Sequence, residues 1–194
     1  MAVEPSQLMV RRRAPGAAPV VRAVAEHLPF PAARFSAAMA VFTVHHWTDP
    51  AAGLAEVRRV TNGPVVVLTW DSTVFSERFW LIRDYVPEAV HADRGLPSVA
   101  EIAAGLGDHR VEVVPVPHDC TDGFSAAYWR RPEMYLDPAA RAAISNLALL
   151  DPVVVERMDA ALRADLESGA WQRRNADLLG LGELDCGYRL VVSE

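Results

Sequence analysis

Two apolar segments with a helical pattern between them constrain the fold of this chain more than any other feature. Residues 36–44 and 65–70 contain no charged side chain, and neither alternates polar and apolar positions like a strand with one solvated face. Between them, Asp49-Pro50 is typical of a helix start, and Asn62-Gly63 is typical of a helix end. Strands that are buried on both faces and joined through a helix usually pair in parallel. The sequence therefore predicts an α/β fold with a parallel sheet.

Further strands and a second helical region are predicted outside this segment. Glu4 ends a short strand, residues 19–24 form a β-branched run, and residues 110–116 and 187–193 would extend the same sheet. Between the last two strands, Asp-Pro pairs at 137 and 151 predict two helix starts. We expect a single domain over residues 1–194, with a helical cap inserted at about 119–177.

Charge and composition exclude several classes of protein. The net charge is −6 and the only basic run is Arg11-Arg12-Arg13, which argues against a nucleic acid as partner. No apolar run approaches the roughly 18 residues of a membrane span, and no secretory signal pattern is present. Cys120 and Cys186 lack metal-ligand spacing. We expect a cytoplasmic protein with reduced thiols, no metal site and no membrane partner.

Two sets of side chains are candidates for a site. An acidic residue at the end of a strand, such as Glu4, can accept both hydroxyls of a ribose, although an exposed glutamate at a turn is an equal explanation. His45-His46 follows the strand of residues 36–44. The pair either packs the turn or supplies a base that takes a proton from a substrate near neutral pH.

The succession of these motifs resembles a known family. It consists of AEHLPF at residues 25–30, His45-His46-Trp47, Asp49-Pro50, EVRRV at residues 56–60 and Gly63. This succession strongly resembles the commonest family of small-molecule S-adenosylmethionine-dependent methyltransferases, which have the Rossmann-like class I fold. The match runs over residues 1–70, and residues 122–132 look like an uncharacterised bacterial branch of the same family.

The resemblance implies a cofactor, an activity and a role for each site residue. The family uses S-adenosylmethionine to methylate an O, N or C nucleophile of a small-molecule acceptor, which the cap would select. Glu4 stands where the family holds the cofactor ribose. The other positions are Val24, Ala25 and Glu26 around the adenine, Ala40 and Phe42 beside the methionine moiety, and His45 and His46 at the mouth of the methyl-transfer pocket.

Three departures from the family pattern bear on this hypothesis. Val24 replaces the usual aspartate and cannot accept a hydrogen bond from the adenine amino group, although the backbone of Ala25 can still serve. Ser36 also stands where an aspartate is common. The family's first strand, its glycine-rich turn and the helix after it are absent from this sequence. That strand would be central in the sheet, between the strand ending at Glu4 and the strand of residues 36–44.

The absent strand leaves two explanations open. We expect Met1 to lie inside a longer reading frame, because unpaired backbone groups in the middle of a sheet are expensive to bury. The alternative is a degenerate protein completed by a partner or by strand exchange in a homodimer.

Two rival functions follow from the same residues. A non-catalytic methyltransferase-like binding or scaffolding protein is favoured by Val24 and by the absent glycine turn. A nicotinamide-dependent oxidoreductase would also use an acidic strand end, but the His45-His46-Trp47 context and the lack of a Tyr/Lys pair argue against it.

Overall fold

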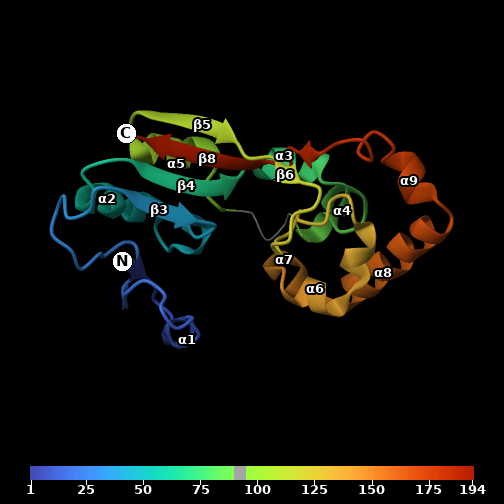
Figure 1. The fold of residues 1–194 in the computed structure, drawn as a ribbon, viewed down its shortest axis with the longest axis horizontal. Helices are drawn as coiled ribbons and strands as arrows, with labels where there is room; N and C mark the ends of the chain where they lie inside the picture. The colour runs from blue at the N-terminus through green and yellow to red at the C-terminus, as the bar shows by residue number, and fades with distance from the viewer. Residues whose placement is uncertain (90–94) are drawn as a thin grey trace. The chain divides into compact units, whose positions relative to one another are not determined.

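The computed structural model describes residues 1–89 and 95–194, which form two compact units (Figure 1). Unit 1 consists of Met1–Thr69, Leu96–Glu112 and Arg189–Glu194, and unit 2 consists of Trp70–Gly95 and Val113–Tyr188. Each unit has its own set of buried hydrophobic side chains. The cap expected at about 119–177 falls inside unit 2.

A four-stranded sheet forms the centre of unit 1. Its order is β3-β4-β8-β5, with bounds Ala38–Val41, Val65–Trp70, Tyr188–Ser193 and His109–Val113. β3 and β4 run parallel, with Ala38 opposite Val65 and Val41 opposite Leu68. The predicted parallel pairing is confirmed, and so is the prediction that the last two strands extend the same sheet.

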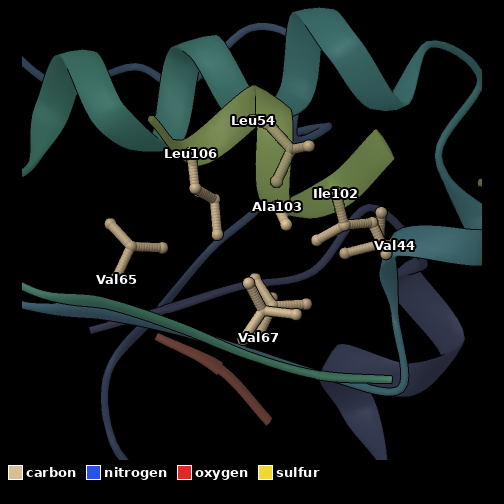
Figure 2. Packing of buried hydrophobic residues seen from close by; sticks show 9 residues of the cluster. Val44, Leu54, Val65, Val67, Ile102, Ala103 and Leu106 are labelled. Atoms are coloured by element: carbon tan, nitrogen blue, oxygen red, sulfur yellow. The ribbon is translucent and has the colours of Figure 1, made fainter. Parts of the chain in front are cut away.

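Two helices cover one face of this sheet. α2 (Pro50–Val60) begins at Asp49, whose side chain accepts the N–H of Ala52, and α5 (Val99–Leu106) begins at a capping box of Ser98 and Glu101. Figure 2 shows Val65 and Val67 of β4 directed toward Ala103 and Leu106 of α5, beside Leu54 of α2. Gly105 permits this packing, since a Cβ there would lie 2.7 Å from Leu54 Cδ1.

The other face of β3 carries exposed apolar side chains. Ala40 belongs to the buried cluster, but Met39 is 74% exposed and Val41 is 45% exposed. The prediction that this strand is buried on both faces is therefore wrong. Successive side chains of a strand alternate between faces, and α2 and α5 both lie on the face that Ala40 occupies.

A separate parallel pair stands at the start of unit 1. β1 (Ala2–Val3) pairs with β2 (Val20–Val21), which is shorter than the predicted strand of residues 19–24. Between them, α1 (Gln7–Arg11) begins at Ser6, whose Oγ accepts the N–H of Met9. Among the described residues, this pair forms a sheet of its own.

Unit 2 is mostly helical. Its elements are α3 (Ser72–Arg78), α4 (Trp80–Asp84), the 3-10 helix η3 (Pro132–Leu136), α6 (Pro138–Ala142), α7 (Ser145–Ala148), α8 (Pro152–Glu167), α9 (Ala170–Arg174) and the antiparallel pair of β6 (Val116–Pro117) and β7 (Glu183–Leu184). The predicted caps Asp137 and Asp151 start α6 and α8. Within the described residues, no helix combines the length and apolar character that crossing a membrane requires.

Aromatic side chains form the core of unit 2. Trp80, Trp129, Tyr135 and Trp171 are all fully buried. The indole N–H of Trp80 donates to the carbonyl oxygen of Trp129 at 2.7 Å, and that of Trp129 donates to the carbonyl oxygen of Val116 at 2.9 Å. These residues pack the helices of unit 2 together, as buried aromatic residues usually do.

Candidate functional site

Several of the predicted site residues follow the carboxyl ends of parallel strands in unit 1. Glu4 comes directly after β1, and Phe42 comes directly after β3. The 3-10 helix η1 (Val44–His46), which carries both histidines, follows Phe42 at an interval of one residue. Open parallel sheets bind their ligands outside the carboxyl ends of the strands, so the segments that follow β1, β2 and β3 form the candidate site, with β1 and β2 in a sheet of their own.

Glu4 is held by the turn between β1 and α1. Its Oε1 accepts the N–H of Ser6 at 2.8 Å, and its own N–H donates to the carbonyl oxygen of Val21. The side chain is half-buried. Because one carboxylate can accept several hydrogen bonds, Glu4 keeps the capacity to bind two neighbouring hydroxyl groups.

The loop after β2 contains the predicted adenine residues. His27 donates its N–H to the carbonyl oxygen of Val24 and so closes a tight turn around Ala25 and Glu26. In the described part of the chain, the N–H of Ala25 makes no hydrogen bond to another residue. It can therefore donate to an acceptor such as a ring nitrogen, while Val24 offers only an apolar contact.

Glu26 makes a contact that its position in the sequence did not predict. Its Oε1 accepts the N–H of Thr48 at 2.7 Å and that of Asp49 at 3.1 Å, so its carboxylate is bound to the turn before α2. The hydrogen bond from Asp49 is the largest cause of a lowered Glu26 pKa, with that from Thr48 acting in the same direction. This oxygen of Glu26 is therefore engaged by the turn before α2, and a role for Glu26 at the adenine stays a prediction.

A second carboxylate fastens the continuation of this loop to α2. Glu56 Oε2 accepts the N–H of Leu28 at 3.0 Å, and Arg59 donates to the carbonyl oxygens of Leu28 and Phe30. The Arg59 guanidinium hydrogen-bonds to Glu56 and lowers the pKa of that carboxyl to about 2. Sequence reasoning did not assign these two residues to the site, although their i,i+3 spacing on a helix is a known pairing signal.

Ala40 and Phe42, which are predicted beside the methionine moiety of the cofactor, differ in which of their atoms are available to a ligand. The side chain of Ala40 lies in the core with α2 and α5, so only its backbone is available at this site. Phe42 adopts a left-handed backbone conformation with φ of +45° and donates its N–H to Leu68. Such a conformation is uncommon for a bulky residue and clusters at functional sites.

The rings of the two histidines lie against each other, tilted, shortly after the end of β3. Their ring centroids are 3.9 Å apart, with the rings inclined at 51°. Burial lowers the pKa of His45 to about 4, and the charge of His46 acts in the same direction. His45 is therefore neutral at pH 7, and it is a weaker base than a side chain tuned to neutral pH would be.

The lowered pKa of His45 predicts a pH-dependent loss of stability. Unfolded His45 takes up its proton near pH 6.5 and folded His45 near pH 4, so the unfolded state binds more protons between these values. The free energy of unfolding should therefore decrease as pH falls through this window. Thermal midpoints measured from pH 6.5 to 4.5 should fall less steeply for His45→Gln than for the unchanged protein. Equal slopes would contradict the prediction.

The described residues form neither a disulfide nor a group of metal ligands. Cys120 and Cys186 are free, both lie in unit 2, and burial raises the pKa of Cys186 to about 12. Among the described residues, no three His, Cys, Asp or Glu side chains are grouped so that they could hold a metal ion. The predicted site residues of unit 1 offer carboxylates, backbone amides and imidazoles.

Comparisons with known proteins define the class to which this fold and site belong. The family described as "Methyltransferase domain" matches residues 1–66. A crystal structure of a "putative methyltransferase from antibiotic biosynthesis pathway" of Anabaena variabilis is 31% identical to this chain. The match covers 100% of this chain and 80% of that chain, with a TM-score of 0.91.

A second solved structure is similar over a smaller part. It is a SAM-dependent methyltransferase of Thermotoga maritima, described as a possible histamine N-methyltransferase, with 26% identity and a TM-score of 0.46. The match covers 59% of this chain and 57% of that one. No curated protein sequence matches the chain significantly.

The identity of 31% to the Anabaena variabilis protein, over 100% of this chain and 80% of that one, decides the family. This chain belongs to the methyltransferase family and has its Rossmann-like fold. The predicted family and fold class are thereby confirmed.

Proposed function

We propose that this protein transfers a methyl group from S-adenosylmethionine to a nucleophilic atom of a small-molecule acceptor. The observation that carries the proposal is the arrangement in unit 1. An acidic residue, a loop with an available N–H and a pair of histidines follow three strands, in a chain related to methyltransferases over its whole length. The cofactor would supply a methyl group activated by its sulfonium charge.

The residues of this site fit the nucleoside part of that cofactor. The carboxylate of Glu4 can accept hydrogen bonds from both ribose hydroxyls, and the N–H of Ala25 can donate to the adenine ring. Val24 would contact the ring through its apolar side chain, without the hydrogen bond that an aspartate makes. Phe42 would present an aromatic side chain beside the methionine moiety, from the left-handed backbone conformation that it adopts directly after β3.

The histidines would orient the acceptor more than deprotonate it. Methyl transfer from a sulfonium depends mainly on in-line positioning of the nucleophile, and the pKa of His45, about 4, makes this residue a weak base. We propose that His45 and His46 border the acceptor. A hydroxyl acceptor would then lose its proton to a group other than His45.

A non-catalytic binding protein is the alternative that two observations favour. Val24 replaces the adenine-binding carboxylate of the family, and Glu26 is already bound to Thr48 and Asp49. A protein of this kind would bind the nucleoside weakly and would release no S-adenosylhomocysteine in the presence of any acceptor.

Titration with S-adenosylhomocysteine tests the proposed cofactor site. Glu4→Ala should weaken binding by about 10- to 100-fold, because hydrogen bonds to a charged group contribute about 1.5–3 kcal/mol. Glu4→Gln should weaken it less, since the amide oxygen can still accept from Ser6 and from one hydroxyl. Calorimetry measures both affinities, with the exposed Glu156→Ala as control. Equal affinity of Glu4→Ala and the unchanged protein would refute the assignment of Glu4.

Turnover is measured separately, with S-adenosylmethionine labelled in its methyl group and a panel of phenol, amine and carboxylic acid acceptors. Transfer of the label to any acceptor supports the methyltransferase. Binding without transfer across the panel supports the non-catalytic alternative, and the absence of binding at millimolar ligand contradicts both.

A further inference from the structure

We propose that Glu26 is a positioning residue. It ties the loop around Ala25 to Thr48 and Asp49, in the turn before α2 that directly follows the segment of His45 and His46. The inference rests on the proposed function, since it gives a role to a contact between two parts of that site. Through this tie, binding of a nucleoside at the loop would order the backbone at the methyl-transfer end of the site.

The contact joins two segments that are distant in the sequence. One oxygen of Glu26 accepts the N–H of Thr48 at 2.7 Å and the N–H of Asp49 at 3.1 Å, so the partners lie 22 and 23 residues away. The start of α2 does not need this contact as a cap, because Asp49 already accepts the N–H of Ala52 through its own side chain. The carboxylate of Glu26 instead binds two amides that precede Pro50, the first residue of α2.

On the histidine side, the held amides belong to a continuous folded segment. His46 donates its N–H to Thr43 at 2.9 Å and Trp47 donates its N–H to Val44 at 3.1 Å, which closes η1. The ring of Trp47 lies directly on α2, since a Cβ at Gly53 would be only 2.4 Å from Trp47 Cε3. Fixing Thr48 therefore restrains the backbone of both histidines.

On the loop side, the restraint reaches the predicted adenine residues. Glu26 is part of the turn that His27 closes onto Val24. Glu56 holds the N–H of Leu28, two residues after Glu26. The loop is thus fastened to α2 through Glu56 and to the histidine turn through Glu26. If Glu26 is removed, the attachment at Glu56 stays, but the connection to the turn is lost.

Substitution separates this role from a contribution to stability alone. Glu26→Ala removes the acceptor oxygen, whereas Glu26→Gln keeps an oxygen that can accept the same N–H groups. Asp49→Ala serves as a matched control, because it removes the cap of α2, at a typical cost of about a tenfold change in helix stability, and leaves the Glu26 contact in place.

The test is amide hydrogen exchange of the whole protein without ligand, resolved by residue. In Glu26→Ala, the amides of Thr48 and Asp49 should exchange about tenfold faster, and those of His46 and Trp47 should also exchange faster than in the unchanged protein. Glu26→Gln should restore most of the protection at all four. Asp49→Ala should accelerate exchange at Ala52 without affecting His46 and Trp47. Unchanged protection of His46 and Trp47 in Glu26→Ala would overturn the inference, as would equal acceleration by Asp49→Ala.

A second arm adds S-adenosylhomocysteine and tests the proposed function separately. If the unchanged protein binds it, His46 and Trp47 should gain protection, and Glu26→Ala should lose most of this gain. If binding occurs and Glu26→Ala keeps the full gain, the inference fails while the proposed function stands. If the unchanged protein does not bind the ligand, the proposed function fails, and the ligand-free arm still decides whether Glu26 holds the turn.

Discussion

Replacing Trp80 by alanine is expected to lower the free energy of unfolding by about 4 kcal/mol, the usual range for a buried tryptophan. Its side chain has no exposed surface. Its ring packs edge-to-face against Trp171, with centroids 5.2 Å apart, and against Tyr135 at 5.6 Å. Truncation would leave a cavity among these rings. It would also leave the carbonyl oxygen of Trp129 without its indole donor in a buried position.

Chemical denaturation followed by circular dichroism measures this loss. The loss has two causes, the cavity and the missing hydrogen bond to Trp129. Trp80→Phe separates them, because phenylalanine retains an aromatic ring and removes only the hydrogen bond and part of the volume. We expect it to cost about half as much as the alanine. Leu149→Ala is the control, since Leu149 is 86% exposed and its truncation should change stability by less than about 0.5 kcal/mol. A loss below about 1 kcal/mol for Trp80→Ala would contradict the prediction.

Local signals in the sequence predicted the helix starts of this protein well. Asp49, Asp137 and Asp151 each precede a proline, and each accepts a backbone N–H from the first turn of its helix. The capping box of Ser98 and Glu101 is present in full. Such signals are reliable because the side chain and the amide that it binds are only two or three residues apart.

The contacts that organise the candidate site could not be predicted in the same way. The pattern of residues 25–30 predicts a loop around the adenine, but it does not reveal that Glu26 binds amides 22 and 23 residues later. Phe42 gives no sign in its residue type of a left-handed conformation. The exposure of Met39 depends on which face α2 and α5 cover, and only the tertiary fold determines that.

Gly63 shows how a correct local prediction can have a different physical basis. The pair Asn62-Gly63 predicts the end of a helix, and α2 does end nearby, at Val60. Gly63 is, however, not among the residues with positive φ, so it does not act as a left-handed cap. Its small size is required because the chain passes close to the carbonyl oxygen of Ser36, where a Cβ would lie only 2.2 Å away.

Gly63→Ala is therefore expected to destabilise unit 1 by about 3 kcal/mol, toward the upper end of the usual cost of overpacking. The added methyl group would meet backbone, which cannot rotate away as a side chain can. Relief requires a shift that would strain two neighbouring hydrogen bonds, from Asn62 to Phe35 at 2.9 Å and from Ala38 to Pro64 at 3.0 Å. The second of these bonds joins the starts of β3 and β4, so the register of the parallel pair is directly affected.

Thermal and denaturant unfolding of Gly63→Ala and Gly180→Ala, measured side by side, provide the check. Gly180 has no atom within 4 Å of an added Cβ and no positive φ, so its replacement removes the same backbone freedom without an overlap. We expect Gly180→Ala to be neutral or slightly stabilising, since alanine restricts the unfolded chain. If the two variants were equally stable, the close approach of Ser36 to Gly63 would have no energetic consequence. A large loss in Gly63→Ala alone would establish that the start of β3, and with it the strand that leads to Phe42 and the histidines, is held in place by the absence of one methyl group.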